Sequence, residues 1–394
     1  MGARRIVALC GAAMTAGVLI ASAGAGTNRA AAPSVDLSSR TSIVKYLRSI
    51  GVDPAGVVIQ RGTRNYAGPS CPGKGWRCTH ATRVVQVAQR SGWNQFECSG
   101  TSDEETGSCL VVQESPDGNT ARCTMATDGD NPISQTCTIS QTSVDGDNRA
   151  FVDQTIKQHE GSDQQGTQEA SVTQTSGSGN NDSHVRQKIE QKTKDQSLDV
   201  AQSQRGRQRA SVVQTSITGD QDSHLKQKSS QDANAPKAMS GTQDLNADLF
   251  ATVDQHSAGL SRNHNRQKEN QDAAARKDSS VSQTLVGPIY CCSDQGTNPD
   301  DHFDVDQTAT QQSSSDSAAL SENVRIFCTT TGTCDGRQVV NENGDRTTNE
   351  CSSPTCSIAI SCVENECTPS EGESFGRVGL LFPDSRGVFA RRRA

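Results

Sequence analysis

The chain has 394 residues, of which only 32% are hydrophobic and 3% aromatic, and its mean hydropathy is -0.65. This composition excludes a conventional core of large apolar side chains through most of the molecule. The net charge of -7 and the pI near 5.6 argue against nucleic acid as the main partner, because phosphate binding requires a basic surface.

Residues 1–25 have the pattern of a secretory signal peptide. Arg4 and Arg5 form a basic start, residues 6–20 are mostly apolar, and residues 21–25 offer small side chains for cleavage. A retained membrane anchor is the alternative, which the shortness of the apolar run disfavours. No later segment is long or apolar enough to span a bilayer. We therefore expect an exported protein, secreted or extracellular and associated with the cell surface.

One short helix and a small domain are predicted next. A polar spacer over 26–40 leads into residues 42–50, where aliphatic residues recur at helical spacing. These residues are Ile43, Val44, Leu47 and Ile50. The segment 41–137 predicts a disulfide-rich, β-rich domain with six cysteines, whose pairing the spacing leaves open.

Fourteen of the fifteen cysteines follow the signal peptide, an even number that suits complete pairing in an oxidising compartment. None lies between 138 and 290, which divides the chain into three parts. The late group forms a second disulfide-rich region over 313–380, to which the adjacent Cys291 and Cys292 contribute. A zinc site in this group is the alternative, which export disfavours. The predicted disulfide residues are Cys71, Cys78, Cys98, Cys109, Cys123, Cys137, Cys291, Cys292, Cys328, Cys334, Cys351, Cys356, Cys362 and Cys367.

The middle segment, 138–312, repeats. Ala170–Gln174 returns as Ala210–Gln214, and pairs of glutamines four residues apart recur in steps of 33, 40, 40 and 40 residues (154, 187, 227, 267 and 307). A fixed period of this size is typical of a solenoid. The pairs are Gln154/Gln158, Gln187/Gln191, Gln227/Gln231, Gln267/Gln271 and Gln307/Gln311.

Neighbouring residues assign these glutamines to strands rather than to one face of a helix. Residues of one parity are small, apolar or glutamine, and residues of the other parity are polar. Such alternation places the glutamines on an inward face and the charges outside. In the first copy the inward residues are Ala150, Val152, Gln154, Ile156 and Gln158. Glycine-bearing turns over 144–148 and 177–181 are predicted to supply positive φ angles between strands.

Stacking these strands at about 4.8 Å per rung lets equivalent glutamines exchange amide hydrogen bonds around a thin dry interior. We predict an all-β solenoid of strand-turn-strand repeats, flanked by the two disulfide-rich regions. Whether each 40-residue repeat makes one coil or two stays open. The predicted ladder residues are Gln141, Gln154, Gln158, Gln174, Gln187, Gln191, Gln214, Gln227, Gln231, Gln255, Gln267, Gln271, Gln283, Gln307 and Gln311.

The repeat resembles the curlin repeat, whose second half has the pattern N-x-A-x3-Q. Asn148–Gln154 matches this pattern, and Asn181–Gln187 keeps its spacing with serine for alanine. The resemblance covers about residues 135–312. It implies a β-solenoid of stacked units, which in the curlin family polymerises into extracellular amyloid fibres used in adhesion and biofilm matrix. The cysteine-rich ends have no counterpart in the fibre subunits of that family.

No catalytic signature is found in the sequence, which predicts a protein that is not an enzyme and takes no cofactor. Asp182, Ser183 and His184 cannot form a triad, because adjacent residues of a strand point to opposite faces. His184, His224 and His264 each precede a ladder glutamine by three residues. If 40 residues make two coils, these histidines lie about 10 Å apart, too far to share a metal ion. We therefore favour a solvated face without metal.

Two further polar features have simple interpretations. The Asp-Gly-Asp-Asn sequences at 128–131 and 145–148 suit turns better than calcium loops, since neither follows the ligand spacing of an EF-hand. The basic tail over 381–394 suits a solvated charged end better than contact with an anionic envelope polymer.

Three functions compete. The first is a curlin-like structural component of an extracellular matrix, coat or adhesive fibre, whose partner is another copy of itself and whose cysteine-rich ends cap the stack. The second is a secreted binding module, in which 41–137 binds a cell-surface ligand and the repeats are a spacer. The third is a disordered glutamine-rich linker over 138–312.

Overall fold

The computed structural model describes most of the chain after residue 36. The predicted signal peptide, most of the polar spacer and the basic tail over 381–394 lie outside the described residues. No helix among the described residues is long and apolar enough to cross a membrane. The described residues are 37–49, 52–101, 106–129, 132–159, 161–194, 199–235, 240–275, 280–293, 298, 300–313, 317–363 and 366–371.

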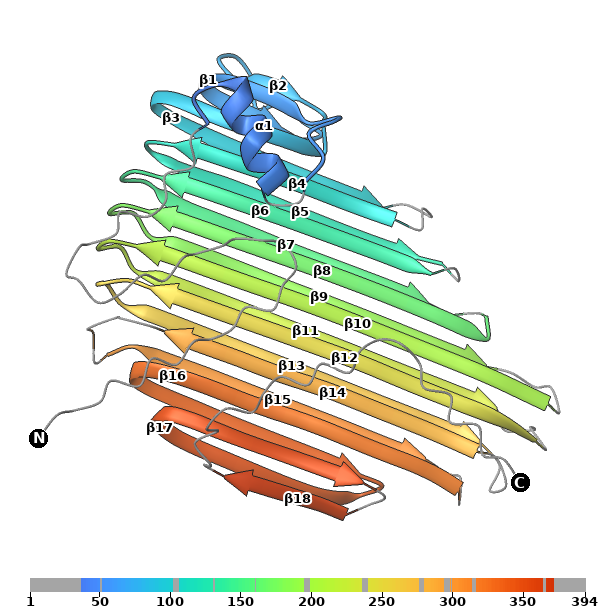
Figure 1. Cartoon of the computed structure of the whole chain (residues 1–394). Coiled ribbons are helices and arrows are strands. Elements are labelled where there is room, and N and C mark those ends of the chain that lie inside the picture. The colour runs from blue at the N-terminus through green and yellow to red at the C-terminus, as the bar shows by residue number, and fades with distance from the viewer. Residues whose placement is uncertain are drawn as a thin grey trace, which may run out of the picture.

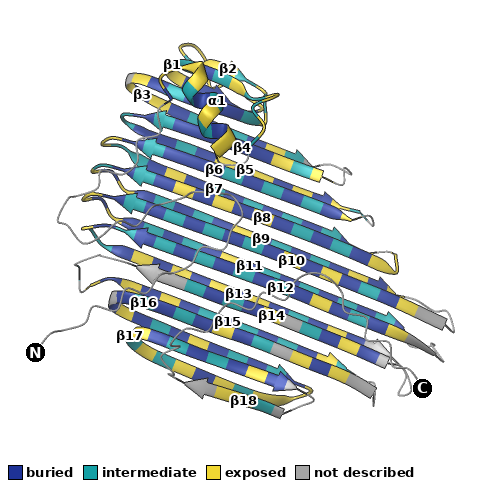
Figure 2. Cartoon of the chain, viewed as in Figure 1, coloured by how far each residue is buried: buried dark blue, intermediate teal, exposed yellow. Residues whose placement is uncertain are grey.

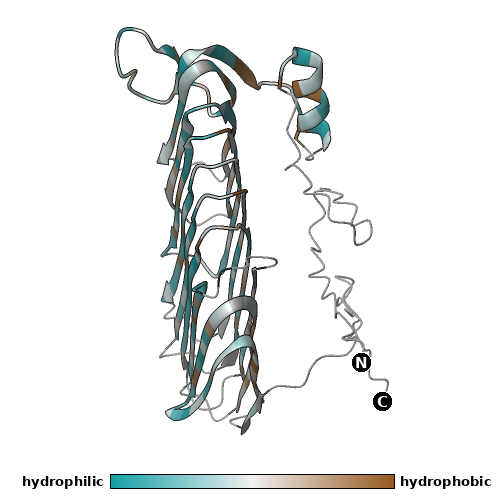
Figure 3. Ribbon diagram, turned by 90° about the vertical axis from the view of Figure 1, so that its left-hand side faces the viewer, coloured by the Kyte–Doolittle hydropathy of each residue, from teal (hydrophilic) through white to brown (hydrophobic). Residues whose placement is uncertain are grey.

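One helix and eighteen linked strands make up the described fold, and the strands stack into two facing layers (Figures 1 and 3). The first layer contains β4 (Thr106–Ser115), β6 (Ile133–Ser143), β8 (Asp163–Ser176), β10 (Asp199–Ser216), β12 (Ser240–His256) and β14 (Ser280–Ser293). The second contains β5 (Gly118–Asp128), β7 (Asp147–Gln158), β9 (Asn181–Lys194), β11 (Gln221–Ala235), β13 (Ser261–Ala275) and β15 (His302–Ser313). The strands β1 (Val58–Ala67), β3 (Arg83–Thr101) and β16 (Ser317–Glu342) take part in both layers. The predicted all-β solenoid is thereby confirmed.

Each 40-residue repeat is one coil. Strand β8 pairs in parallel with β10, placing Ala170 beside Ala210, and β9 pairs in parallel with β11, placing Gln187 beside Gln227. Both partners are 40 positions apart (210 minus 170, 227 minus 187). A coil therefore consists of one strand in each layer, and equivalent residues lie one rung apart.

The coils widen towards the middle of the stack and then narrow (Figure 1). The register offset is 28 residues from Gln113 to Gln141, 40 from Gln174 to Gln214, and 37 from Val281 to Ala318. The strands change in step, from 10 residues in β4 to 18 in β10 and 14 in β14. A longer coil thus has longer strands. The coils at each end of the stack are narrower than those in the middle.

Burial alternates along the strands, as the sequence predicted (Figure 2). In β7 every second residue from Asn148 to Gln158 is buried, and in β15 the same holds from Phe303 to Gln311. Aliphatic residues from both layers form one narrow core that includes Val152, Val172 and Val212. The thin interior replaces the large apolar core that the composition excludes.

Near the N-terminal end of the stack, the helix α1 (Arg40–Ser49) covers the outer face of the first layer, and the short strand β2 (Arg77–Thr79) pairs with β1 at the end itself. Ile43 and Leu47 are buried with Leu110 and Val112 on the outer face of the first layer. The Ser39 hydroxyl accepts a hydrogen bond from the amide of Ser42 at 3.0 Å and so caps the start of the helix.

The C-terminal end changes strand direction. Strand β17 (Asp345–Val363) runs antiparallel to β16 along both layers, and β18 (Glu366–Glu371) runs antiparallel to β17. All earlier pairings among the described strands are parallel. The parallel stack therefore ends at β16.

The predicted boundary between residues 137 and 138 falls inside β6, so the chain does not divide there. Strands β1, β3, β4 and β5, within the cysteine-rich segment 41–137, are coils of the same stack. Parallel pairing continues from β4 to β6 across this boundary. The cysteine content therefore changes within one continuous stack of coils.

Candidate functional site

A ladder of glutamines runs through the interior of the first layer. After the first glutamine, Gln60, each side-chain Nε2 donates to Oε1 of the glutamine one coil earlier, over distances of 2.6 to 2.9 Å. All of these side chains are at most 3% exposed. The ladder consists of Gln60, Gln86, Gln113, Gln141, Gln174, Gln214 and Gln255.

The second hydrogen of each amide ties the two layers together. Nε2 of Gln141 donates to the carbonyl of Arg149 at 3.0 Å, and Nε2 of Gln174 donates to the carbonyl of Asp182 at 2.8 Å. Both acceptors belong to the facing layer. A primary amide has two donors and one acceptor oxygen, so a stacked glutamine satisfies the rung above, the rung below and the opposite strand. This explains why glutamine occupies a position that water does not reach.

The second layer holds two more glutamine ladders, four residues apart. Their amide hydrogen bonds are 2.7 to 2.9 Å long. The ladders are Gln154, Gln187, Gln227, Gln267, Gln307 and Gln338, and beside them Gln158, Gln191, Gln231, Gln271 and Gln311.

Fourteen of the fifteen predicted glutamines lie in these ladders. Gln283 does not, although it is buried, because its register neighbours are Leu245 and Leu320. The sequence analysis missed Gln60, Gln86 and Gln113, which lie in the segment set apart for its cysteines. It also missed a short glutamine ladder and an asparagine ladder. These are Gln135, Gln168 and Gln208, and Asn65, Asn94, Asn119, Asn148 and Asn181.

The turn glycines serve close packing and not positive φ angles, which corrects the sequence-based expectation. None of Gly146, Gly177 and Gly179 has positive φ. A Cβ at Gly179 would instead overlap the carbonyl of Gly146 in the previous coil, and one at Gly146 would overlap the backbone of Asp117. Turns of successive coils therefore stack backbone on backbone.

Ten of the fourteen predicted cysteines form local disulfides, which join positions 5 to 11 residues apart. Cys123 and Cys137 are buried thiols. The side chains of Cys291 and Cys292 lie outside the described residues. The bonds are Cys71–Cys78, Cys98–Cys109, Cys328–Cys334, Cys351–Cys356 and Cys362–Cys367.

The zinc alternative meets a chemical obstacle. Glu342, Cys362 and Cys367 place one ligand atom each within 4.8 Å of one another. However, Cys362 and Cys367 are bonded to each other, and a metal would require their thiolates. The four late cysteines Cys351 to Cys367 thus form two disulfides, one within β17 and one between β17 and β18.

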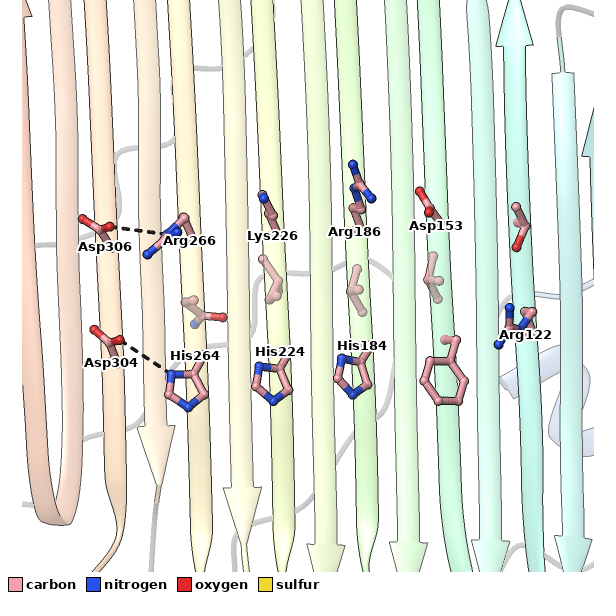
Figure 4. Close-up of a pocket in the computed structure, with 16 residues that line it drawn as sticks. Arg122, Asp153, His184, Arg186, His224, Lys226, His264, Arg266, Asp304 and Asp306 are labelled. Atoms are coloured by element: carbon pink, nitrogen blue, oxygen red, sulfur yellow. Dashed lines mark ion pairs between the residues drawn. The ribbon is translucent and has the colours of Figure 1, made fainter.

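The outer face of the second layer carries a stack of histidines (Figure 4). Ring centroids lie 4.7 Å apart between His184 and His224 and 5.0 Å apart between His224 and His264. Phe151 continues the stack at 5.3 Å from His184. The spacing corrects the value of about 10 Å expected for two coils per repeat, because each repeat is one coil.

The stacking of the rings sets the distance between the histidine nitrogens that could bind a metal ion. The rings are within 11° of parallel, so their nitrogens are separated by about the same distance as their centroids. Two nitrogens bound to one zinc ion are at most about 4 Å apart, since each Zn–N bond is about 2 Å. The column therefore presents ring edges side by side rather than a convergent set of ligands.

Acidic residues flank the histidine column. His184 pairs with Asp182 at 3.1 Å, and His224 pairs with Asp222 at 3.3 Å. Burial raises the pKa of the Asp182 carboxyl, and the carboxylate of Asp222 raises this pKa further, against the lowering effect of the His184 imidazole. Ser183 points into the interior, where it is fully buried, so the Asp-Ser-His sequence is split between two faces.

Comparisons of the chain with protein-family models, with curated proteins and with solved structures found no match. The geometry of the described residues is therefore the ground for assigning a function.

Two columns of permanent cations run beside the histidines. Arg186, Lys226 and Arg266 are in register on adjacent coils of β9, β11 and β13. Two positions further along the same strands, Lys188, Lys228 and Lys268 are also in register. An open trough of about 640 Å³ follows the histidines and the first of these columns (Figure 4).

Proposed function

We propose that this protein is an exported, non-enzymatic structural component of an extracellular matrix or coat, which acts as a self-contained β-solenoid rod. The observation that carries the proposal is the glutamine ladder from Gln60 to Gln255, which passes through both the cysteine-rich segment and the repeats. Such a ladder makes one rigid body from coils that bury little apolar surface. Such rigidity suits a structural role.

The N-terminal end of the ladder, at Gln60, favours a rod that does not polymerise by adding coils at this end. Nε2 of Gln60 donates to the carbonyl of Tyr66 and, at 2.9 Å, to the carbonyl of Arg77. Arg77 lies in β2, and the disulfide Cys71–Cys78 closes the loop that precedes it. The position that another coil would occupy above Gln60 is taken by the chain itself.

The other end supports the same interpretation. Gln338 completes its ladder by donating to Gln307 at 2.8 Å, and its antiparallel neighbour on the next strand is Asn349. An incoming coil in parallel register would meet β17 and β18 in place of a glutamine rung. Curlin-like fibre growth requires open parallel edges, so the caps favour a monomeric rod over a polymerising subunit.

Truncation tests the role of the C-terminal cap. Ending the chain after Gly344 removes β17 and β18 and exposes the parallel edge of β16, and ending it after Glu371 is the matched control. We expect the full chain and the control to be monomers by light scattering. The shorter chain should associate end to end and give a cross-β spacing of about 4.8 Å.

Fibres formed by the purified full chain itself would contradict the rod and restore the fibre hypothesis. Circular dichroism of the truncated chain distinguishes association of folded rods from aggregation of an unfolded chain. Detection of the protein outside the cell when it is produced with residues 1–25 tests export separately.

A further inference from the structure

The two cation columns on β9, β11 and β13 stack like charges on neighbouring rungs. Rungs are about 4.8 Å apart, and like charges directly opposite on paired strands destabilise a sheet. Arg186, Lys226 and Arg266 nevertheless occupy three successive rungs in a chain whose net charge is -7. The repeat brings these equivalent residues into register, and the resulting stripe of three cations offers an anion a favourable surface.

The opposite face of the same coils shows charge compensation. On the first layer, Glu169 is in register with Arg209, and Arg207 pairs with Asp248 at 3.6 Å. Each of these two arginines thus has one acidic register neighbour, and its neighbour on the other side, Phe250 or Thr167, is uncharged. On the second layer, Asp153 and Asp306 lie in register at the two ends of the first cation column. Lys226 at its centre has a cation on each side, which no arginine of the first-layer pairs has.

Part of the charge on the cationic face is available to a ligand. Lys188 pairs with Glu190 at 2.8 Å and Arg266 pairs with Asp306 at 3.4 Å. Among the described residues, Arg186, Lys226 and Lys268 make no ion pair and are exposed. The acidic partners lie at the edges of the array, so its centre keeps a positive field.

The histidine column narrows the chemistry of the ligand. The rings of His184, His224 and His264 cover one another's faces and leave only their edges towards solvent. Single-stranded nucleic acids bind by stacking bases on exposed ring faces, which this column does not offer. Ring edges and cations instead suit hydroxyl and carboxylate groups, through hydrogen bonds and ion pairs.

We propose that this face binds a linear acidic polysaccharide that carries a carboxylate on each sugar, with the glycan chain running along the axis of the stack. Each rung supplies one cation per column at a constant interval, which matches a polymer with one charge per repeating sugar. The histidine edges bind its hydroxyl groups. The identity of the ligand rests on the proposed extracellular role, in which acidic glycans surround the rod.

Binding of polygalacturonate to the full chain tests the proposal, with dextran as the neutral glycan. The test variant combines Arg186→Ser, Lys226→Ser and Arg266→Ser. The matched control combines Arg205→Ser, Arg207→Ser and Arg209→Ser, which removes the same charge from the opposite face. We expect the full chain to bind polygalacturonate and not dextran, the test variant to bind about tenfold more weakly, and the control to be unchanged. Affinity should fall as salt is added.

Three results would overturn the proposal: equal weakening in both variants, equal binding of dextran, or tighter binding of a single-stranded DNA of the same charge. Circular dichroism shows that both variants keep their strands, so weakened binding is not misfolding. The proposed monomeric rod is tested separately, by light scattering. A monomer that ignores polygalacturonate therefore rejects the glycan site and leaves the proposed function standing.

Discussion

Nε2 of Gln174 donates a hydrogen bond of 2.9 Å to Oε1 of Gln141, a residue 33 positions earlier in the chain and one coil away. The same nitrogen donates to the carbonyl of Asp182 in the other layer at 2.8 Å. Gln174 in turn accepts from Gln214 at 2.8 Å. One side chain thus joins three coils and both layers. A substitution at this position therefore tests how much the ladder contributes to stability.

Replacing Gln174 with alanine should destabilise the protein by about 3 kcal/mol, because it removes three buried hydrogen bonds, to Gln141, Gln214 and Asp182, and leaves Oε1 of Gln141 without its donor. The free energy of unfolding in denaturant measures the loss. Thr173→Ala is the matched control, since this neighbour is exposed on the outer face, and its effect should stay within about 0.5 kcal/mol. A loss from Gln174→Ala as small as that expected for Thr173→Ala would show that the ladder contributes little to stability.

The glutamine ladders were predictable because alternation and period are local and repeated signals. Gln187, Gln227 and Gln267 are equally spaced in sequence and lie in register in the structure. The extension to Gln60 was not predictable from a period, because coils near that end are shorter and the offsets are no longer 40. The cysteine content then suggested a boundary after residue 137, and the pairing of β4 with β6 continues across it.

The alignment of the cation columns was visible in the sequence, but the distance between their charges was not. The period of 40 already aligned Arg186, Lys226 and Arg266. The distance between these charges stayed open, since one coil per repeat places them about 5 Å apart and two coils place them about 10 Å apart. Only the register of the strands shows that a repeat is one coil.

Gly179→Ala should be strongly destabilising although its φ angle is ordinary. The new Cβ would overlap the carbonyl of Gly146, which is backbone and cannot move aside as a side chain can. We expect a loss of about 3 kcal/mol in unfolding free energy, at the upper end for overpacking. Gly100→Ala is the control, because a Cβ there meets no atom within 4 Å. A loss at position 100 as large as that at 179 would rule out the clash as the cause.

In an oxidising compartment, Cys123 and Cys137 are expected to add a sixth disulfide to the five of the described residues. They are in register with Cys98 and Cys109 on the adjacent coil, which are bonded across the two layers. Oxidation by a glutathione disulfide joins their sulfurs, passes two hydrogens to the glutathione and yields two glutathione thiols. Peptide mapping of the unreduced protein should find the Cys123–Cys137 bond beside Cys98–Cys109.

The mapping requires alkylation in denaturant. Burial raises the pKa of the Cys137 thiol well above its usual range, and its hydrogen bond with Cys123 raises it further. The native Cys137 thiol would therefore react slowly whether or not it can pair. Complete alkylation of both residues in unreduced, denatured protein from an oxidising host would show that they stay thiols.

Two carboxyl groups on the cationic face should respond to pH with opposite signs. Hydrogen bonds from Lys188 and Lys192 lower the pKa of Glu190 to about 2, so its contribution is present at neutral pH and is lost as the pH falls from about 4.5 towards 2. Burial and Asp222 raise the pKa of Asp182. Its contribution is therefore present below its ordinary pKa and is lost as the pH rises through the raised value.

Unfolding free energies of Glu190→Gln and Asp182→Asn measure these signs. At pH 7, Glu190→Gln should be less stable than the unmodified protein by about 1 kcal/mol, a value reduced for screening of a surface ion pair, and the difference should vanish near pH 2. Asp182→Asn should be more stable at pH 7, because it removes a carboxylate that burial and Asp222 disfavour, and this gain should vanish in acid. If both variants lose stability at pH 7 and show the same pH dependence, the assignment of opposite electrostatic roles to the two carboxyl groups is wrong.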